Sequence, residues 1–157
     1  MELNNTQKAA VKAAINADAV LGVLPNTTAA ADRIAREFNK NSSPEVIVWK
    51  SSVTKADLLE QISYADLLSR TADQRAILSI YLQGEVIPCD RQRVRTAFDT
   101  IFSGTGTATR LLAFFKRTAT RGEALFATGG TGLDDNPHRL VKEGDLLGTD
   151  IELLRAS

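Results

Sequence analysis

The sequence has 157 residues and a mass of 17.0 kDa, the length of one domain, and 43% of its residues are apolar. Its 19 basic and 19 acidic side chains cancel, which disfavours both a strongly basic nucleic-acid-binding protein and an acidic tail protein. No apolar run approaches the roughly 18 residues of a membrane span, and the polar start MELNNTQ is unlike a secretion signal. We expect a globular protein without membrane contact, whose single cysteine, Cys89, forms no internal disulfide.

The charges are unevenly distributed along the chain. Residues 1–89 carry a net charge of −1, residues 90–121 carry +5 and residues 122–157 carry −4. Two interpretations are open: the basic and acidic segments neutralise each other within one molecule, or they meet across a repeated contact between subunits.

The N-terminal third predicts two helices and one extended segment. Asn5 or Thr6 can cap a first, alanine-rich helix. A turn at Pro25 leads to a second helix that Asn26 or Thr27 caps. Residues 45–50 contain three β-branched residues in a row and predict a short strand, and Trp49 within it is typical of a core or interface residue.

The middle of the chain predicts short helices. Thr54 with Asp57 resembles a capping box, and a helical turn follows at residues 64–68. Thr71 caps a helix that runs to Gln83. This helix has little polar face, so we expect it to be central; its apolar residues are Ile77, Leu78, Ile80, Tyr81 and Leu82.

The next helix is predicted from Asp90 to Phe102. Arg91, Arg95 and Asp99 form an outward ladder on this helix. The residues expected to point inward are Val94, Phe98, Ile101 and Phe102.

The longest helix is predicted over residues 107–127, about 30 Å at 1.5 Å per residue. Its projection places Arg110, Arg117 and Arg121 in one stripe, with Lys116 nearby. Three interpretations of this stripe are open: a solvated helix face, a contact with carboxylates of a neighbouring subunit, or a contact with a nucleic-acid backbone.

The segment after this helix is acidic and rich in turns. It predicts a small hairpin about Glu143 and Gly144 and a terminal helical turn opened by Thr149 or Asp150. The fold class is therefore mainly α: a helical domain over residues 1–128 and a C-terminal arm over residues 129–157 that docks on a neighbour or partner. The apolar anchors expected in this arm are Leu146, Leu147, Leu153 and Leu154.

No motif indicates catalysis, a cofactor or a metal. The glycine cluster at residues 128–132 follows a predicted helix and lacks the Lys-Ser/Thr pair of a phosphate loop, so it predicts a helix end. The only histidine, His138, lies in a predicted surface turn. Asp134 and Asp135 lack the spacing of a calcium loop. We therefore expect no enzyme, no cofactor and no metal site.

Four segments carry a resemblance to a known group of proteins. They are VWKSSV with Trp49, residues 93–104, KRTATRGEALFATGGTG (116–132) and VKEGDLLGTDIELLRAS at the C-terminal end. They resemble small virion-assembly proteins of tailed bacteriophages and prophages, and residues 116–132 are the most specific part. The resemblance implies a structural virion protein. The size and the predicted helical content of the chain are similar to those of head–tail connectors, also called adaptors.

This resemblance implies a ring of copies of the chain, twelvefold to match a portal, between the portal and the tail or neck proteins. DNA would pass through its channel and touch basic side chains without sequence preference. The expected location is the head–tail junction of the virion, with the host cytoplasm during assembly. The alternatives are a minor capsid-associated or tail-completion protein, a small helical DNA-binding regulator and an enzyme. The residues expected at subunit or partner contacts are Arg110, Lys116, Arg117, Arg121, Leu146, Leu147, Leu153 and Leu154.

Overall fold

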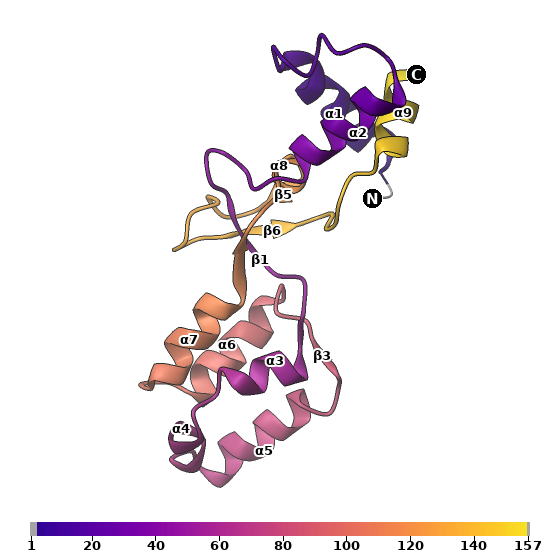
Figure 1. Cartoon of the computed structure of the whole chain (residues 1–157). Helices are drawn as coiled ribbons and strands as arrows, with labels where there is room; N and C mark the ends of the chain where they lie inside the picture. Colours follow the sequence, from indigo (N-terminus) through magenta and orange to yellow (C-terminus); the bar gives the residue numbers. More distant parts are fainter. Residues whose placement is uncertain (1–2, 157) are drawn as a thin grey trace. The chain divides into compact units, whose positions relative to one another are not determined.

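A computed structural model describes residues 3–156 of the chain, about half of which lie in helices (Figure 1). The helices are α1 (Asn5–Ala17), α2 (Thr28–Phe38), α3 (Lys55–Glu60), α4 (Tyr64–Leu68), α5 (Ala72–Tyr81), α6 (Gln92–Ile101), α7 (Gly106–Phe114), α8 (Arg121–Ala124) and α9 (Gly148–Ala156). The strands are β1 (Ile47–Trp49), β2 (Val53–Thr54), β3 (Val86–Ile87), β4 (Lys116–Thr118), β5 (Ala127–Thr128) and β6 (His138–Leu140). None of the helices in residues 3–156 has the length and apolar character to span a bilayer.

The chain forms two compact units. Unit 1 comprises residues 1–48 and 118–157, and unit 2 comprises residues 49–117. This division differs from the expected single helical domain that ends at residue 128. It arises because two separate sets of apolar side chains are buried, one in each unit.

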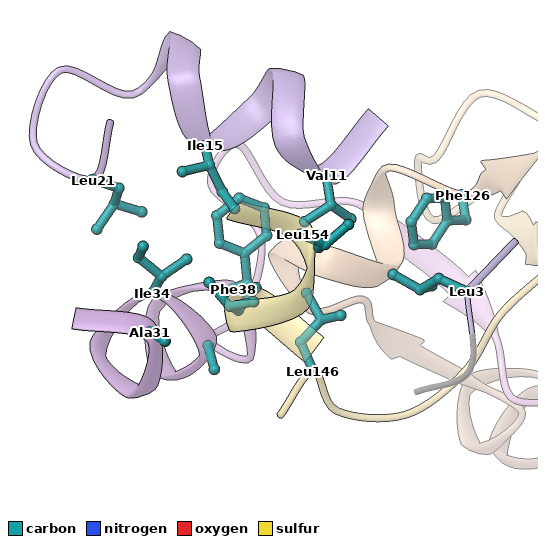
Figure 2. Close-up of a cluster of buried hydrophobic side chains, with 12 residues drawn as sticks. Leu3, Val11, Ile15, Leu21, Ala31, Ile34, Phe38, Phe126, Leu146 and Leu154 are labelled. Atoms are coloured by element: carbon teal, nitrogen blue, oxygen red, sulfur yellow. The ribbon is translucent and has the colours of Figure 1, made fainter. Parts of the chain in front are cut away.

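Unit 1 is built on α1, α2 and α9, and α9 packs mainly along α2 (Figures 1 and 2). Ile34 and Phe38 of α2 are fully buried, and Ile151 and Leu154 of α9 join the same core. The remaining buried members are Leu3, Val11, Ile15, Leu21, Ala31, Ala35, Phe126 and Leu146. The predicted C-terminal arm is therefore part of the body of unit 1.

Unit 2 contains α3 to α7 and a two-stranded antiparallel ribbon in which Val53 pairs with Ile87. Phe98 of α6 lies between two aromatic rings, with ring centres 5.5 Å from Tyr81 and 5.7 Å from Phe115. The other buried members of this core are Val53, Leu58, Leu78, Ile87, Cys89, Val94, Ile101, Phe102 and Leu111. The predicted inward face of α6 is confirmed.

A four-stranded sheet has the strand order β4-β1-β6-β5. β5 and β6 form an antiparallel hairpin in which Ala127 pairs with Leu140. The connection between them contains the glycine cluster, and a Cβ on Gly130, at φ +72, would lie 2.6 Å from the Asn136 carbonyl oxygen. The prediction of a helix end at this cluster is therefore wrong, and so is the prediction of a hairpin at Glu143 and Gly144.

The predicted long helix over residues 107–127 is also wrong. α7 ends at Phe114, the chain then forms β4, and α8 begins only at Arg121. Thr120 is the N-cap of α8 and forms a capping box with Glu123, so a helix start lies inside the expected helix.

Several predicted helix starts are confirmed, whereas the predicted position of α5 is wrong. Thr27, Thr54 and Thr71 cap α2, α3 and α5, while α1 is capped by Asn4, one residue before the expected pair. α5 is not central, because Leu78 is the only buried residue of this helix, all of which the structure describes.

Candidate subunit-contact surfaces

The basic residues predicted as one stripe lie on separate elements. Arg110 belongs to α7 of unit 2, Lys116 and Arg117 belong to β4, and Arg121 begins α8 of unit 1. They share no helix face, because the helix that would have aligned them is interrupted by β4.

Arg121 is tied to the body of unit 1. Its Nη2 lies 2.8 Å from Oδ2 of Asp18, and its guanidinium carbon lies 4.6 Å from the centre of the Phe38 ring. The cation therefore bridges the end of α1 to the end of α2 while covering an aromatic ring of the core.

Asp18 also organises the connection between α1 and α2. Its Oδ1 accepts hydrogen bonds from the backbone N–H groups of Val20 and Leu21, each at 2.9 Å. These two bonds and then the bond from Arg121 lower the pKa of Asp18 from its usual 3.8 to about 2. The turn leaves no room at Gly22, where a Cβ would lie 3.0 Å from the carbonyl oxygens of Asn16 and Asp18.

We name residues 18–24 the valine loop, because this ordered turn presents two valines to solvent. Leu21 is buried in the core (Figure 2), whereas Val20 is 56% exposed and Val23 is 79% exposed. Arg155 of α9 donates to the carbonyl oxygens of Leu24 and Pro25, which holds the far end of the loop. The loop is thus anchored at both ends with its valines outward.

The pH dependence of unit 1 tests this anchor. A pKa lowered in the folded state stabilises the protein above the unfolded value of 3.8, and that stabilisation is lost as the pH falls toward 2. Asp18→Asn keeps the Oδ1 acceptor but loses the charge that Arg121 contacts. We expect it to lower the urea midpoint at pH 5 and to have a smaller effect near pH 2.5. The exposed Asp135→Asn is the control and should change neither midpoint; an equal loss for Asp18→Asn at both pH values would contradict this role.

The four leucines predicted as anchors are divided between core and surface. Leu146 and Leu154 are buried in unit 1, whereas Leu147 is 57% and Leu153 is 69% exposed. The Asn39 side chain donates to the carbonyl oxygen of Leu146 and accepts from its N–H, which explains how the segment before α9 is attached to α2. Sequence reasoning missed Asn39, since nothing in its position relates it to residue 146.

We name Ile77 and Ile80 the isoleucine face, because both lie on the outward side of α5 in unit 2. They are 45% and 62% exposed, whereas Leu78 is buried in the core and Tyr81, the next residue along the helix from Ile80, packs against it. The start of the helix is held by the Thr71–Gln74 capping box. The isoleucine face is therefore presented by a helix that its N-terminal capping box and its contacts with the core hold in place.

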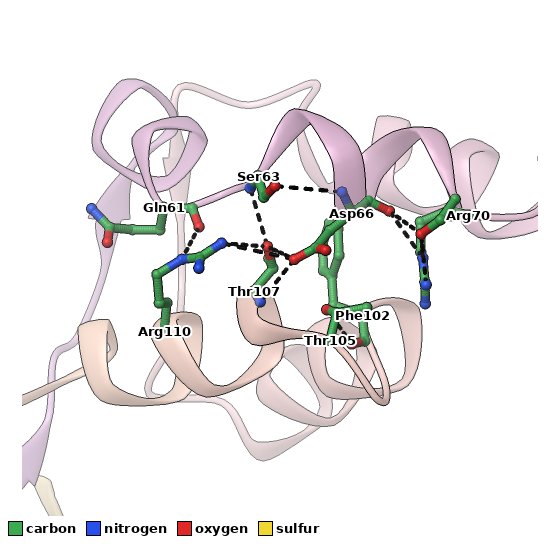
Figure 3. Close-up of polar contacts among 9 residues, drawn as sticks. Gln61, Ser63, Asp66, Arg70, Phe102, Thr105, Thr107 and Arg110 are labelled. Carbon is green, nitrogen blue, oxygen red and sulfur yellow. Dashed lines mark hydrogen bonds and ion pairs between the residues drawn. The ribbon is translucent and has the colours of Figure 1, made fainter.

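Asp66 of α4 caps α7 from outside that helix (Figure 3). The Asp66 carboxylate accepts from the hydroxyl of Thr107 at 2.6 Å and from its N–H at 3.0 Å. The hydrogen bond from the Thr107 hydroxyl makes the largest contribution to the lowered pKa of Asp66. Arg110 donates to Gln61 and Thr107, and its Nη2 lies 3.8 Å from the same carboxylate. Arg110, a predicted contact residue, thus stabilises the packing of α4 on α7.

Cys89 and Arg95 are both held by backbone carbonyl groups of unit 2. Cys89 is buried, its thiol donates to the Lys50 carbonyl oxygen, and burial raises its pKa to about 11. Arg95 lies 4.0 Å from the centre of the Trp49 ring and donates to the carbonyl oxygens of Cys89 and Asp90. Within residues 3–156 no three His, Cys, Asp or Glu residues gather as metal ligands.

A hollow of about 240 Å³ lies beside β2 in unit 2. Lys50 Nζ lies 4.1 Å from the centre of the Phe114 ring on its wall. The Thr54 hydroxyl and the Asp57 carboxylate, also on the wall, bond to each other at the start of α3. The residues that line the hollow are Lys50, Ser52, Val53, Thr54, Asp57, Val86 and Phe114.

Comparison of the chain with protein-family models, with curated proteins and with solved structures found no match.

Proposed function

We propose that the chain is a structural virion protein of a tailed bacteriophage or prophage that acts as a head–tail connector. Copies of it assemble into an oligomeric ring between the portal and the tail, and DNA passes through the channel of that ring. The proposal starts from the resemblance of residues 116–132 and the three other segments to virion-assembly proteins.

The observation that carries the proposal is the opposite charge of the two units. Unit 1 has nine basic and twelve acidic residues, a net charge of −3, whereas unit 2 has ten basic and seven acidic residues, a net charge of +3. A ring requires two different surfaces on each subunit that complement one another. A chain divided into oppositely charged units supplies such a pair.

Exposed apolar side chains on both units support the same proposal. Complementary charge gives orientation and specificity, while buried apolar groups supply most of the affinity in a protein interface. Val23 and Leu153 of unit 1 and Ile80 of unit 2 are each more than half exposed. These groups would be covered on assembly.

Mass photometry of the chain mixed with the portal protein of its own phage or prophage tests the proposal. We expect the chain alone to be monomeric or loosely associated, and the mixture to contain a portal ring enlarged by several copies of the chain. A mixture in which the portal keeps its own mass would contradict the connector function.

Binding to capsid protein and to duplex DNA separates the alternatives. A minor capsid-associated protein would bind capsid protein in place of portal. A DNA-binding regulator would retard duplex DNA in a gel with a steep dependence on salt and would not bind the portal.

A further inference from the structure

We infer that neighbouring copies of this chain join head to tail, with the valine loop of unit 1 in one copy packed on the isoleucine face of unit 2 in the next. The inference rests on the proposed function and specifies the two surfaces through which copies of the chain contact one another.

The valine loop has the character of a preorganised contact. Asp18, Gly22 and Arg155 hold its backbone in place, so little conformational entropy remains to be lost on docking. This secured turn exposes Val20 and Val23, whereas Leu21 is buried in the core and Leu24 packs against it.

The isoleucine face supplies an apolar partner of matching size. Two β-branched side chains one helical turn apart, Ile77 and Ile80, form a ridge on α5 that its own unit covers only in part. Two valines on a tight turn can pack against such a ridge, and each side chain would lose its remaining contact with water.

The net charges of the units favour the other unit of a second copy as the occupant. Pairing unit 1 with unit 1 brings together two net charges of −3, and pairing unit 2 with unit 2 brings together two of +3. Pairing unit 1 with unit 2 of a neighbour brings opposite charges together, which favours a heterologous contact over an isologous one. A heterologous contact between identical chains generates a ring when its rotation closes.

Cysteine crosslinking tests this contact directly. The native Cys89 is buried and its pKa is raised to about 11, so introduced thiols will react alone. Val23→Cys and Ile80→Cys are prepared as separate full-length variants and oxidised singly and as a mixture, with and without portal. We expect the mixture to give crosslinked dimer on the order of tenfold faster than either variant alone.

Matched positions provide the controls. Val141→Cys in unit 1, at 56% exposure, replaces Val23→Cys, and Leu112→Cys in unit 2, at 44% exposure, replaces Ile80→Cys. Neither control should crosslink faster in the mixture. A chain that carries both Val23→Cys and Ile80→Cys should give a ladder of multimers that ends at the closed ring.

The outcomes separate this inference from the proposed function. The head-to-tail contact is overturned if the mixture crosslinks no faster than the single variants, both with and without portal. If the portal ring still gains copies of the chain, the connector function stands and the contact surfaces are wrong. A crosslinked ladder without any portal binding would support the contact and contradict the connector function.

Discussion

Phe98→Ala is expected to destabilise unit 2 by about 3–5 kcal/mol, the usual cost of removing a buried phenylalanine ring. Phe98 is 1% exposed, and its ring contacts those of Tyr81 and Phe115, so its loss leaves a cavity between α5, α6 and the end of α7. Amide hydrogen exchange measures the effect by segment. Protection should fall in residues 49–117 and should persist in α1, α2 and α9, because the two cores have no residue in common.

Phe98→Leu is the control for this prediction. It keeps much of the apolar volume, so the loss should be clearly smaller than that of Phe98→Ala. Equal loss of protection across both units in Phe98→Ala would contradict the division into two cores.

Phe38→Ala is expected to destabilise unit 1 in the same way, again by about 3–5 kcal/mol. Phe38 is fully buried at the end of α2, and its ring also carries the guanidinium of Arg121 at 4.6 Å. Its removal deprives the core of a large side chain and Arg121 of its aromatic support. Protection should fall in α1, α2 and α9, whereas α6 and α7 should retain theirs.

A second measurement distinguishes this effect from a purely local one. The unfolding of Phe38→Ala should become less sensitive to Arg121→Met than the unfolding of the natural chain, because the ring under the cation is gone. If Arg121→Met costs the same in both backgrounds, the contact between Arg121 and Phe38 contributes nothing to unit 1.

Local signals made much of the helical structure predictable. Thr27, Thr54 and Thr71 each precede a helix with a side chain that accepts a hydrogen bond from its first turn, and the sequence indicates all three. The apolar spacing of α6 likewise identifies its inward residues. Such features depend on residues three or four positions apart.

The errors came where tertiary contacts overrule local propensity. Residues 107–127 have the composition of one helix, yet β4 interrupts it. On either side of β4, the Lys50 N–H donates to the carbonyl oxygen of Phe115 and the Ala119 N–H donates to that of Val46. The capping box of Thr120 with Glu123 was the available signal for a new helix start. The bonds of Asn39 to Leu146 and of Arg121 to Asp18 join residues about a hundred positions apart, and no pattern in one sequence relates them.

These long-range contacts also change the interpretation of the predicted contact residues. Arg121, Leu146 and Leu154 stabilise unit 1, and Arg110 stabilises the packing of α4 on α7. The outward residues Val23, Ile77 and Ile80 were not among the predicted contacts, because the sequence alone does not reveal which apolar side chains remain exposed.

Electron cryo-microscopy of the virion neck tests the proposed assembly most directly. We predict a ring of this chain between portal and tail, in which each copy presents unit 1 to one neighbour and unit 2 to the other. The absence of the chain from the neck, or copies paired through identical surfaces about a twofold axis, would contradict it.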